Sequence, residues 1–94
     1  MNHSMIELLT TFEHHKHDEK WLCVQLNQLD PMARLKVIKR YGEVYREAYE
    51  RESIDYKKDN RARFEANTRL RIYLQKYKQM IMRNISFTIT SEQD

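Results

Sequence analysis

The stretch NRARFEANTRLRIYLQKYKQMIMRN, residues 60–84, contains neither glycine nor proline and predicts one long basic helix. When its residues are placed at about 100° intervals around a helix axis, seven of them fall in one apolar sector. They are Ala66, Leu70, Tyr73, Leu74, Tyr77, Met80 and Ile81. Because an apolar sector of this kind needs a core to bury it, we expect the rest of the chain to pack against this helix.

Cations line both edges of the predicted buried sector. Arg69, Lys76 and Arg83 recur every seven residues along one edge, and Arg71 and Lys78 lie along the other. The side that faces away from the core carries no formal charge, although a solvated helix face usually does. Its members form what we call the outer stripe: Phe64, Thr68, Ile72, Gln75, Gln79 and Met82.

Two interpretations of the outer stripe are open. Arg and Lys side chains can extend their apolar stems over scattered surface apolar groups, which is common on solvated helices. Alternatively, the stripe is a second interface for a partner, with apolar anchors at its centre and arginines at its rim.

The chain as a whole predicts a single all-α domain. It has 94 residues, which is enough for one small core, and we treat residues 1–94 as one helical domain. One glycine and one proline are too few for the turns of a many-stranded fold. Residues 1–3 and 91–94 are expected to be disordered.

Asp30 followed by Pro31 marks the clearest helix start. Aspartate caps helices, and proline at the first helical position sacrifices only an amide that would be unpaired. We expect a small helical bundle built on a long antiparallel hairpin, with short N-terminal helices laid across it. The predicted helices are residues 5–13, 18–28, 31–52 and 60–84.

Gly42 lies in the apolar sector of the predicted 31–52 helix, where the missing side chain would let another helix approach closely. Five tyrosines are placed to meet along the seam of the hairpin, with rings buried and hydroxyl groups at the edge. They are Tyr41, Tyr45, Tyr49, Tyr73 and Tyr77. A core role for them competes with a stacking platform for single-stranded nucleic acid, and their spacing favours the core.

The C-terminal residues 85–90 alternate between apolar and small polar types. Ile85, Phe87 and Ile89 are separated by serine and threonine, which is the period of a β-strand. A lone strand leaves its backbone groups unpaired, so three alternatives stay open. The tail is irregular or continues the helix, it pairs with a second copy of the chain, or it adds to the sheet edge of a partner protein.

Charge and cysteine usage restrict the compartment and the partners. The net charge is +3 and the isoelectric point is near 9.1, which permits nucleic-acid binding without requiring it. Cys23 is the only cysteine, so no intramolecular disulfide can form, and a reducing cytoplasm is favoured. We find no pattern of a signal peptide or of a membrane span, and we expect no membrane partner.

The only cluster of metal-ligand types is His14, His15, His17, Asp18 and Cys23. A structural zinc site normally has a second clear ligand pair, and this chain lacks one, so a polar linker is favoured and we predict no metal and no cofactor. The sequence leaves open whether the three histidines bind a metal. It holds no G-x-S-x-G elbow, no glycine-rich phosphate loop and no H-E-x-x-H motif, so we expect no enzyme activity.

Two functional classes remain. The first is a protein-binding module that presents the outer stripe and the tail residues Ile85, Phe87 and Ile89 to a larger protein or nucleoprotein complex. The second is a nucleic-acid-binding protein that uses the cations of the long helix against phosphates. Those cations are Arg61, Arg63, Arg69, Arg71, Lys76, Lys78 and Arg83. A homodimer stays open as a further alternative.

Three segments carry a resemblance to a known group of proteins. Residues 21–29, residues 41–49 and the stretch ARFEANTRLR at 62–71 resemble small uncharacterised helical proteins encoded by bacteriophages and prophages. The resemblance implies a phage accessory protein in the cytoplasm of a bacterial host, acting as an adaptor or an inhibitor of a nuclease, defence or replication machine. A net charge of +3 excludes a bulk mimic of DNA, which would be acidic.

Overall fold

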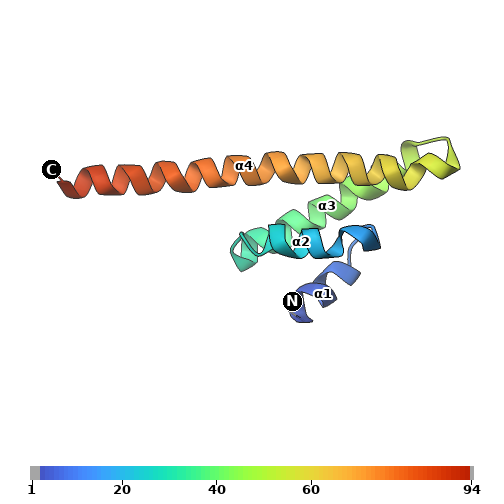
Figure 1. Cartoon of the computed structure of the whole chain (residues 1–94), viewed down its shortest axis with the longest axis horizontal. Helices are drawn as coiled ribbons and strands as arrows, with labels where there is room; N and C mark the ends of the chain where they lie inside the picture. Colours follow the sequence, from blue (N-terminus) through green and yellow to red (C-terminus); the bar gives the residue numbers. More distant parts are fainter. Residues whose placement is uncertain (1–2, 94) are drawn as a thin grey trace.

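The computed structural model describes residues 3–93 of the chain, with side chains described for residues 5–83, and all of its secondary structure is helical (Figure 1). The all-α prediction is confirmed, as is the hairpin, because α3 and α4 pack against each other in opposite directions. The elements are α1 (His3–Thr10), the 3-10 turn η1 (Lys16–Asp18), α2 (Glu19–Leu26), α3 (Pro31–Arg51), the 3-10 turn η2 (Asp55–Lys57) and α4 (Lys58–Gln93).

The start of α3 has the predicted capping geometry. A carboxylate oxygen of Asp30 accepts a hydrogen bond from the backbone N–H of Ala33 at 3.0 Å, and Pro31 occupies the first turn. This hydrogen bond to the ionised form lowers the pKa of Asp30. Arg34 then donates to the backbone oxygens of Leu26 and Leu29, both at 3.0 Å. These bonds satisfy carbonyl groups at the end of α2 and fasten it to α3.

The core lies between the N-terminal half of α4 and the other three helices. Its fully buried leucines and isoleucine come from α1, α2 and α3, and α4 contributes small residues near its start, where α3 approaches it closely. The buried apolar residues are Met5, Leu9, Leu22, Cys23, Leu26, Leu29, Ile38, Tyr41, Val44, Tyr45, Ala48, Ala62, Ala66, Leu70 and Leu74. The base of α4 therefore packs mainly on α3, and α2 touches it through Trp21, while α1 completes the core from the side of α2.

The C-terminal half of α4 projects from this core (Figure 1). A helix of 36 residues is about 54 Å long at about 1.5 Å per residue, and the molecule measures 60 × 28 × 17 Å. Its radius of gyration is 16.2 Å, whereas a compact chain of this length would have about 12 Å. The hydroxyl of Tyr77 lies 3.4 Å from Asp30, just before α3 begins. Among the described elements, none lies beside α4 beyond that point.

The predicted buried sector of α4 is wrong at its C-terminal end. Tyr73, Met80 and Ile81 are 41%, 54% and 38% exposed, while Tyr77 is half-buried. The apolar sector continues, but α3 starts at Pro31 and provides no surface opposite Met80 and Ile81. Tyr49 is also exposed, so only Tyr41 and Tyr45 are buried along the seam as predicted.

The strand alternative for residues 85–90 is also wrong, because α4 continues through them to Gln93. No glycine or proline follows Asn84, and a helix pairs its backbone groups locally without a second strand. The side chains of Ile85, Phe87 and Ile89 lie outside the described residues. Of the ends predicted to be disordered, His3 and residues 91–93 have helical backbone, and residues 1, 2 and 94 lie outside the description.

The other helix boundaries shift by a few residues. The first helix ends at Thr10 instead of near residue 13, and the separate turn η1 precedes α2. The two N-terminal helices are thus distinct. The last helix begins at Lys58, two residues earlier than predicted. No helix in the described part of the chain is both long enough and apolar enough to cross a membrane.

Gly42 is buried as predicted, but a connecting segment approaches it instead of another helix. A Cβ atom at this position would lie 3.1 Å from the backbone nitrogen of Glu13 and 3.2 Å from Cβ of Phe12. The segment that follows α1 therefore depends on the missing side chain for its close approach to α3.

The substitution Gly42→Leu should destabilise the protein by about 2 kcal/mol, because the new side chain meets backbone that cannot move aside freely. Thermal unfolding should show a Tm lowered by roughly 10 °C. Lys39→Leu, at an exposed position of the same helix, is the control and should leave the Tm nearly unchanged. Equal Tm values for the two variants would contradict the close packing at Gly42.

Candidate functional site

The outer stripe lies on the side of α4 opposite its buried residues. Phe64 is 65% exposed, Ile72 is 47% exposed and Met82 is 68% exposed. Gln75 and Gln79 are also exposed, and Thr68 is half-buried. The structure thus brings the predicted stripe together as a continuous surface, which has apolar side chains at both ends and in the middle.

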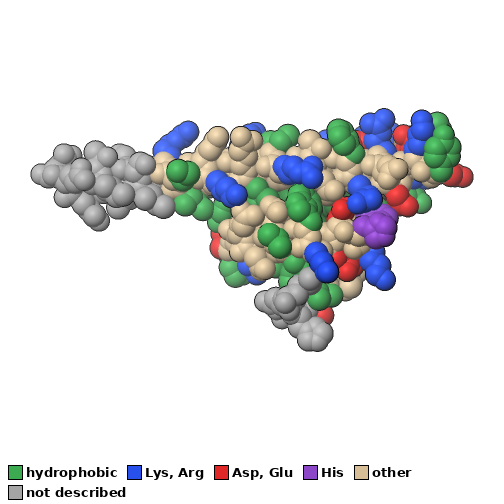
Figure 2. Space-filling view, in the orientation of Figure 1, with side chains coloured by type: hydrophobic (Ala, Val, Ile, Leu, Met, Phe, Trp, Pro, Cys, Tyr) green, Lys and Arg blue, Asp and Glu red, His purple; other side chains and the backbone are tan. Residues whose placement is uncertain are grey.

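Lys and Arg side chains are spread along α4 with hydrophobic side chains between them (Figure 2). Residues 66–91 contain five Lys or Arg and no Asp or Glu. Arg69, Lys76, Lys78 and Arg83 are exposed, and none of them forms an ion pair with another described side chain. This part of the helix is therefore a cationic surface without internal compensation.

Three of the predicted binding cations have partners within the molecule, and two of these, Arg61 and Arg71, are exposed. Arg61 lies 3.5 Å from a carboxylate oxygen of Glu52. The guanidinium carbon of Arg71 lies 4.9 Å from the centre of the Trp21 ring, which is a cation–π contact between α4 and α2. Both side chains remain exposed: the first pair links α4 to the residue after α3, and the second contact links α4 to α2.

Arg63 belongs to a half-buried network that holds α4 to the N-terminal segment. Its Nε and Nη2 atoms donate to the two oxygens of Asp18, both at 2.9 Å. Asn67 donates to Asp18 at 3.2 Å and accepts a hydrogen bond from the hydroxyl of Tyr41 at 2.5 Å. Asp18 is only 8% exposed, and its hydrogen bonds with Arg63 hold the pKa of its carboxyl below the usual range.

Sequence reasoning grouped Arg63 with the nucleic-acid-binding cations and did not find this network. Arg63 and Asn67 are four residues apart beside the apolar sector, so they share one face of α4. This position beside the apolar sector is the sequence feature that points to a structural role for Arg63. Asp18, however, is 45 residues away from Arg63 in the sequence, and only the folded chain identifies it as the partner.

In the histidine-rich segment, the side chains of His14 and His15 form local hydrogen bonds. His14 pairs with Glu19 at 3.0 Å and with the backbone oxygen of Phe12 at 2.8 Å. The ring of His15 accepts from the backbone N–H of His17 at 3.1 Å, and Asp18 is committed to Arg63. Within the residues that the structure describes, no three His, Cys, Asp or Glu side chains are grouped to hold a metal ion.

Buried titratable groups in the core are held in their neutral forms. Burial raises the pKa of the Cys23 thiol, and it raises the pKa values of Tyr41 and Tyr45. The hydroxyl of Tyr45 donates to Asp59 at 3.2 Å. A buried thiol with a raised pKa is a poor nucleophile, so Cys23 acts as a small core residue.

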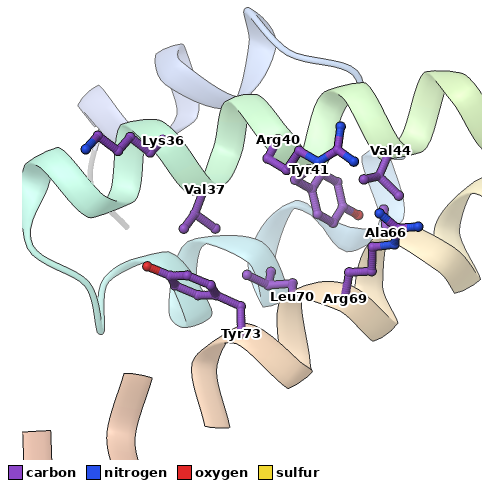
Figure 3. A pocket seen from close by; sticks show the side chains of 9 residues that line it. All are labelled: Lys36, Val37, Arg40, Tyr41, Val44, Ala66, Arg69, Leu70 and Tyr73. Atoms are coloured by element: carbon purple, nitrogen blue, oxygen red, sulfur yellow. The ribbon is translucent and has the colours of Figure 1, made fainter. Parts of the chain in front are cut away.

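A cavity of about 270 Å³ opens between α3 and α4 (Figure 3). Its lining is mainly apolar and aromatic, and it includes three cationic residues. The lining residues are Lys36, Val37, Arg40, Tyr41, Val44, Ala66, Arg69, Leu70 and Tyr73. None of them belongs to the outer stripe, so α4 presents two separate surfaces.

Comparison with known proteins assigns no family to this chain. No protein-family model, curated protein or solved structure matches the chain. The resemblance to phage and prophage proteins stays a prediction from the sequence. A functional assignment therefore rests on the surface and the cavity of the molecule itself.

Proposed function

We propose that the protein is a non-enzymatic binding module that docks α4 onto a larger protein complex as an adaptor or an inhibitor. The supporting observation is the surface of α4 from residue 69 to residue 83, where exposed apolar side chains alternate with cations that form no ion pair with a described carboxylate. Its C-terminal half stands clear of the described core, so a partner can reach it from several sides (Figure 1). Apolar anchors surrounded by arginines are typical of protein interfaces.

The charge of α4 supports an acidic partner over a second copy of this chain. Two copies joined along residues 66–91 would bring five cations against five, and neither helix would supply a carboxylate there. Like charges that face each other across an interface cost free energy and slow association. An acidic protein surface would instead be attracted to this helix, and its apolar groups would cover the outer stripe.

Nucleic acid is the second candidate, and the unpaired cations of the projecting helix favour it. Lys76, Lys78 and Arg83 could each neutralise a phosphate. The exposed apolar groups favour protein instead, because contact with a phosphate backbone leaves Phe64 and Met82 in water or buries them against charged groups.

The resemblance to phage and prophage proteins supports a bacterial nuclease, defence or replication machine as the partner complex. The buried, free Cys23 suits a reducing cytoplasm. Such an inhibitor binds acidic residues of its partner through its cations and inserts its apolar side chains into the partner surface.

The triple variant Phe64→Ser, Ile72→Ser, Met82→Ser tests the protein-binding function. Tagged wild-type protein should capture a partner from nuclease-treated host lysate, and the triple variant should recover at least tenfold less of it. The matched control is Val24→Ser, Met32→Ser, Leu35→Ser, which removes apolar side chains that are 61%, 72% and 52% exposed on α2 and α3. Quantitative mass spectrometry reports recovery, and circular dichroism verifies the fold.

A salt titration with a fluorescent 30-base DNA, as single strand and as duplex, tests the second candidate. Phosphate binding weakens log-linearly with salt, by a slope of about 0.7 to 0.9 per phosphate contact. We expect weak binding to both probes at physiological salt. Tight DNA binding that Arg69→Gln plus Lys76→Gln abolishes, together with partner capture that the serine triple variant leaves intact, would show that the outer stripe is not the interface and that the cations bind nucleic acid.

A further inference from the structure

The cavity between α3 and α4 has an apolar end and a cationic end. Val37 of α3 and Tyr73 of α4 face each other at one end, with Leu70 beside them (Figure 3). The hydroxyl of Tyr41 donates a hydrogen bond to Asn67, and the ring of Tyr41 faces the cavity. A hydrocarbon group placed at this end would contact aliphatic and aromatic carbon from both helices.

The guanidinium groups of Arg40 and Arg69 lie toward the other end, around Tyr41 and Val44 (Figure 3). Arg40 is 3.0 Å from Glu43 and 3.8 Å from Glu47, so two carboxylates on the surface of α3 compensate its charge and Arg69 is the principal cation of the cavity. Arg69 forms no ion pair with another described side chain, and no carboxylate lines the cavity. Lys36 points away from the cavity in the same view.

We propose that this cavity is a binding site for a small apolar carboxylate. The hydrocarbon tail lies between Val37, Leu70 and Tyr73, and the carboxylate binds Arg69, with Arg40 as a second donor. A cavity of about 270 Å³ is just below the usual range for small-molecule sites, so the ligand is of the size of a short fatty acid. The site is independent of the outer stripe and goes beyond the proposed protein-binding function.

The lining favours a ligand that has both an apolar tail and a negative charge. A neutral hydrocarbon would leave Arg69 without a counter-charge, and an inorganic anion would leave the apolar end in contact with water. An apolar cation would be repelled by Arg69, which has no ion-pair partner among the described side chains. The combination of an apolar tail with one negative charge satisfies the whole lining.

Octanoate, octan-1-ol and octylammonium, used below their aggregation concentrations, are the probes that separate these ligand classes. In calorimetric titrations, octanoate should bind at least tenfold more tightly than octan-1-ol, and octylammonium should not bind. From butanoate to octanoate, each added methylene should tighten binding by about threefold to fourfold, because it is buried in the cavity. In carbon-detected spectra, octanoate should shift the methyl signals of Val37, Val44 and Leu70.

Variants of exposed residues test the assigned contacts without removing the core. Arg69→Gln should weaken octanoate binding about tenfold, since a charge-assisted contact is lost. Arg83→Gln is the matched control, because Arg83 is another exposed arginine of α4 outside the cavity, and it should bind octanoate as the wild type does. The proposal is overturned if Arg69→Gln binds octanoate unchanged, if octylammonium binds equally well, or if the shifts gather at Met80 and Met82 instead.

Discussion

Replacing Arg63 by alanine is expected to lower the free energy of unfolding by about 2 to 3 kcal/mol. The loss leaves the 8% exposed Asp18 carboxylate with Asn67 as its remaining side-chain partner, and a buried charge without its counter-charge is costly. For a domain whose total stability is about 5 to 15 kcal/mol, this is a large fraction. Urea denaturation followed by far-ultraviolet circular dichroism measures the change.

Arg51→Ala is the matched control for this effect. Arg51 also binds both oxygens of a carboxylate, those of Glu65, at 2.8 and 2.9 Å. Its side chain is 63% exposed, however, and water replaces the lost contact, so the cost should be about 0.5 kcal/mol or less. If the two variants were equally stable, burial of the Asp18–Arg63 pair would not determine its contribution.

Acid should remove the same interaction. Because Arg63 lowers the pKa of Asp18 in the folded protein, the pair stabilises the fold above the ordinary carboxyl pKa of about 4 and loses this contribution as the pH falls through the lowered value. The wild-type protein should therefore lose more stability below about pH 4 than Asp18→Asn does. Parallel stability profiles for the two proteins would contradict this assignment.

Leu70→Ala should cost about 3 kcal/mol, whereas Met80→Ala should change the free energy of unfolding by less than about 0.5 kcal/mol. Both residues belong to the same apolar sector of α4, but Leu70 is 3% exposed and Met80 is 54% exposed. The first substitution leaves a cavity beside α3, and the second removes atoms that already face water. Urea denaturation of both variants at low protein concentration makes the comparison.

A costly Met80→Ala would mean that the projecting half of α4 is covered in solution. The contact would then come from a second copy of the chain, and the unfolding midpoint would rise with protein concentration. If the midpoint is independent of concentration and Met80→Ala has the stability of the wild type, then no second copy of the chain covers this surface. Binding experiments can then use substitutions on that surface without disturbing the fold.

Local features of the sequence predicted the helices and their pairing. Asp30 and Pro31 determine where α3 starts, because capping and the fixed φ angle of proline act within one turn. Residues 58–93 contain no glycine or proline, so no helix breaker interrupts α4 and the helix can continue through residues 85–90. The exposed outer stripe also follows from helical periodicity, since residues opposite a buried sector face outward.

The tertiary structure decided where the core ends, which cation is internal and where the cavity lies. Periodicity assigns Leu70 and Met80 to one sector, but burial depends on whether α3 reaches that turn, and α3 begins opposite Tyr77. Charge assigns Arg63 and Arg69 to one class, but only the packing of η1 against α4 gives Arg63 a buried carboxylate. The sequence by itself therefore determined the helices and their faces, whereas the register between segments far apart in the chain determined what each face contacts.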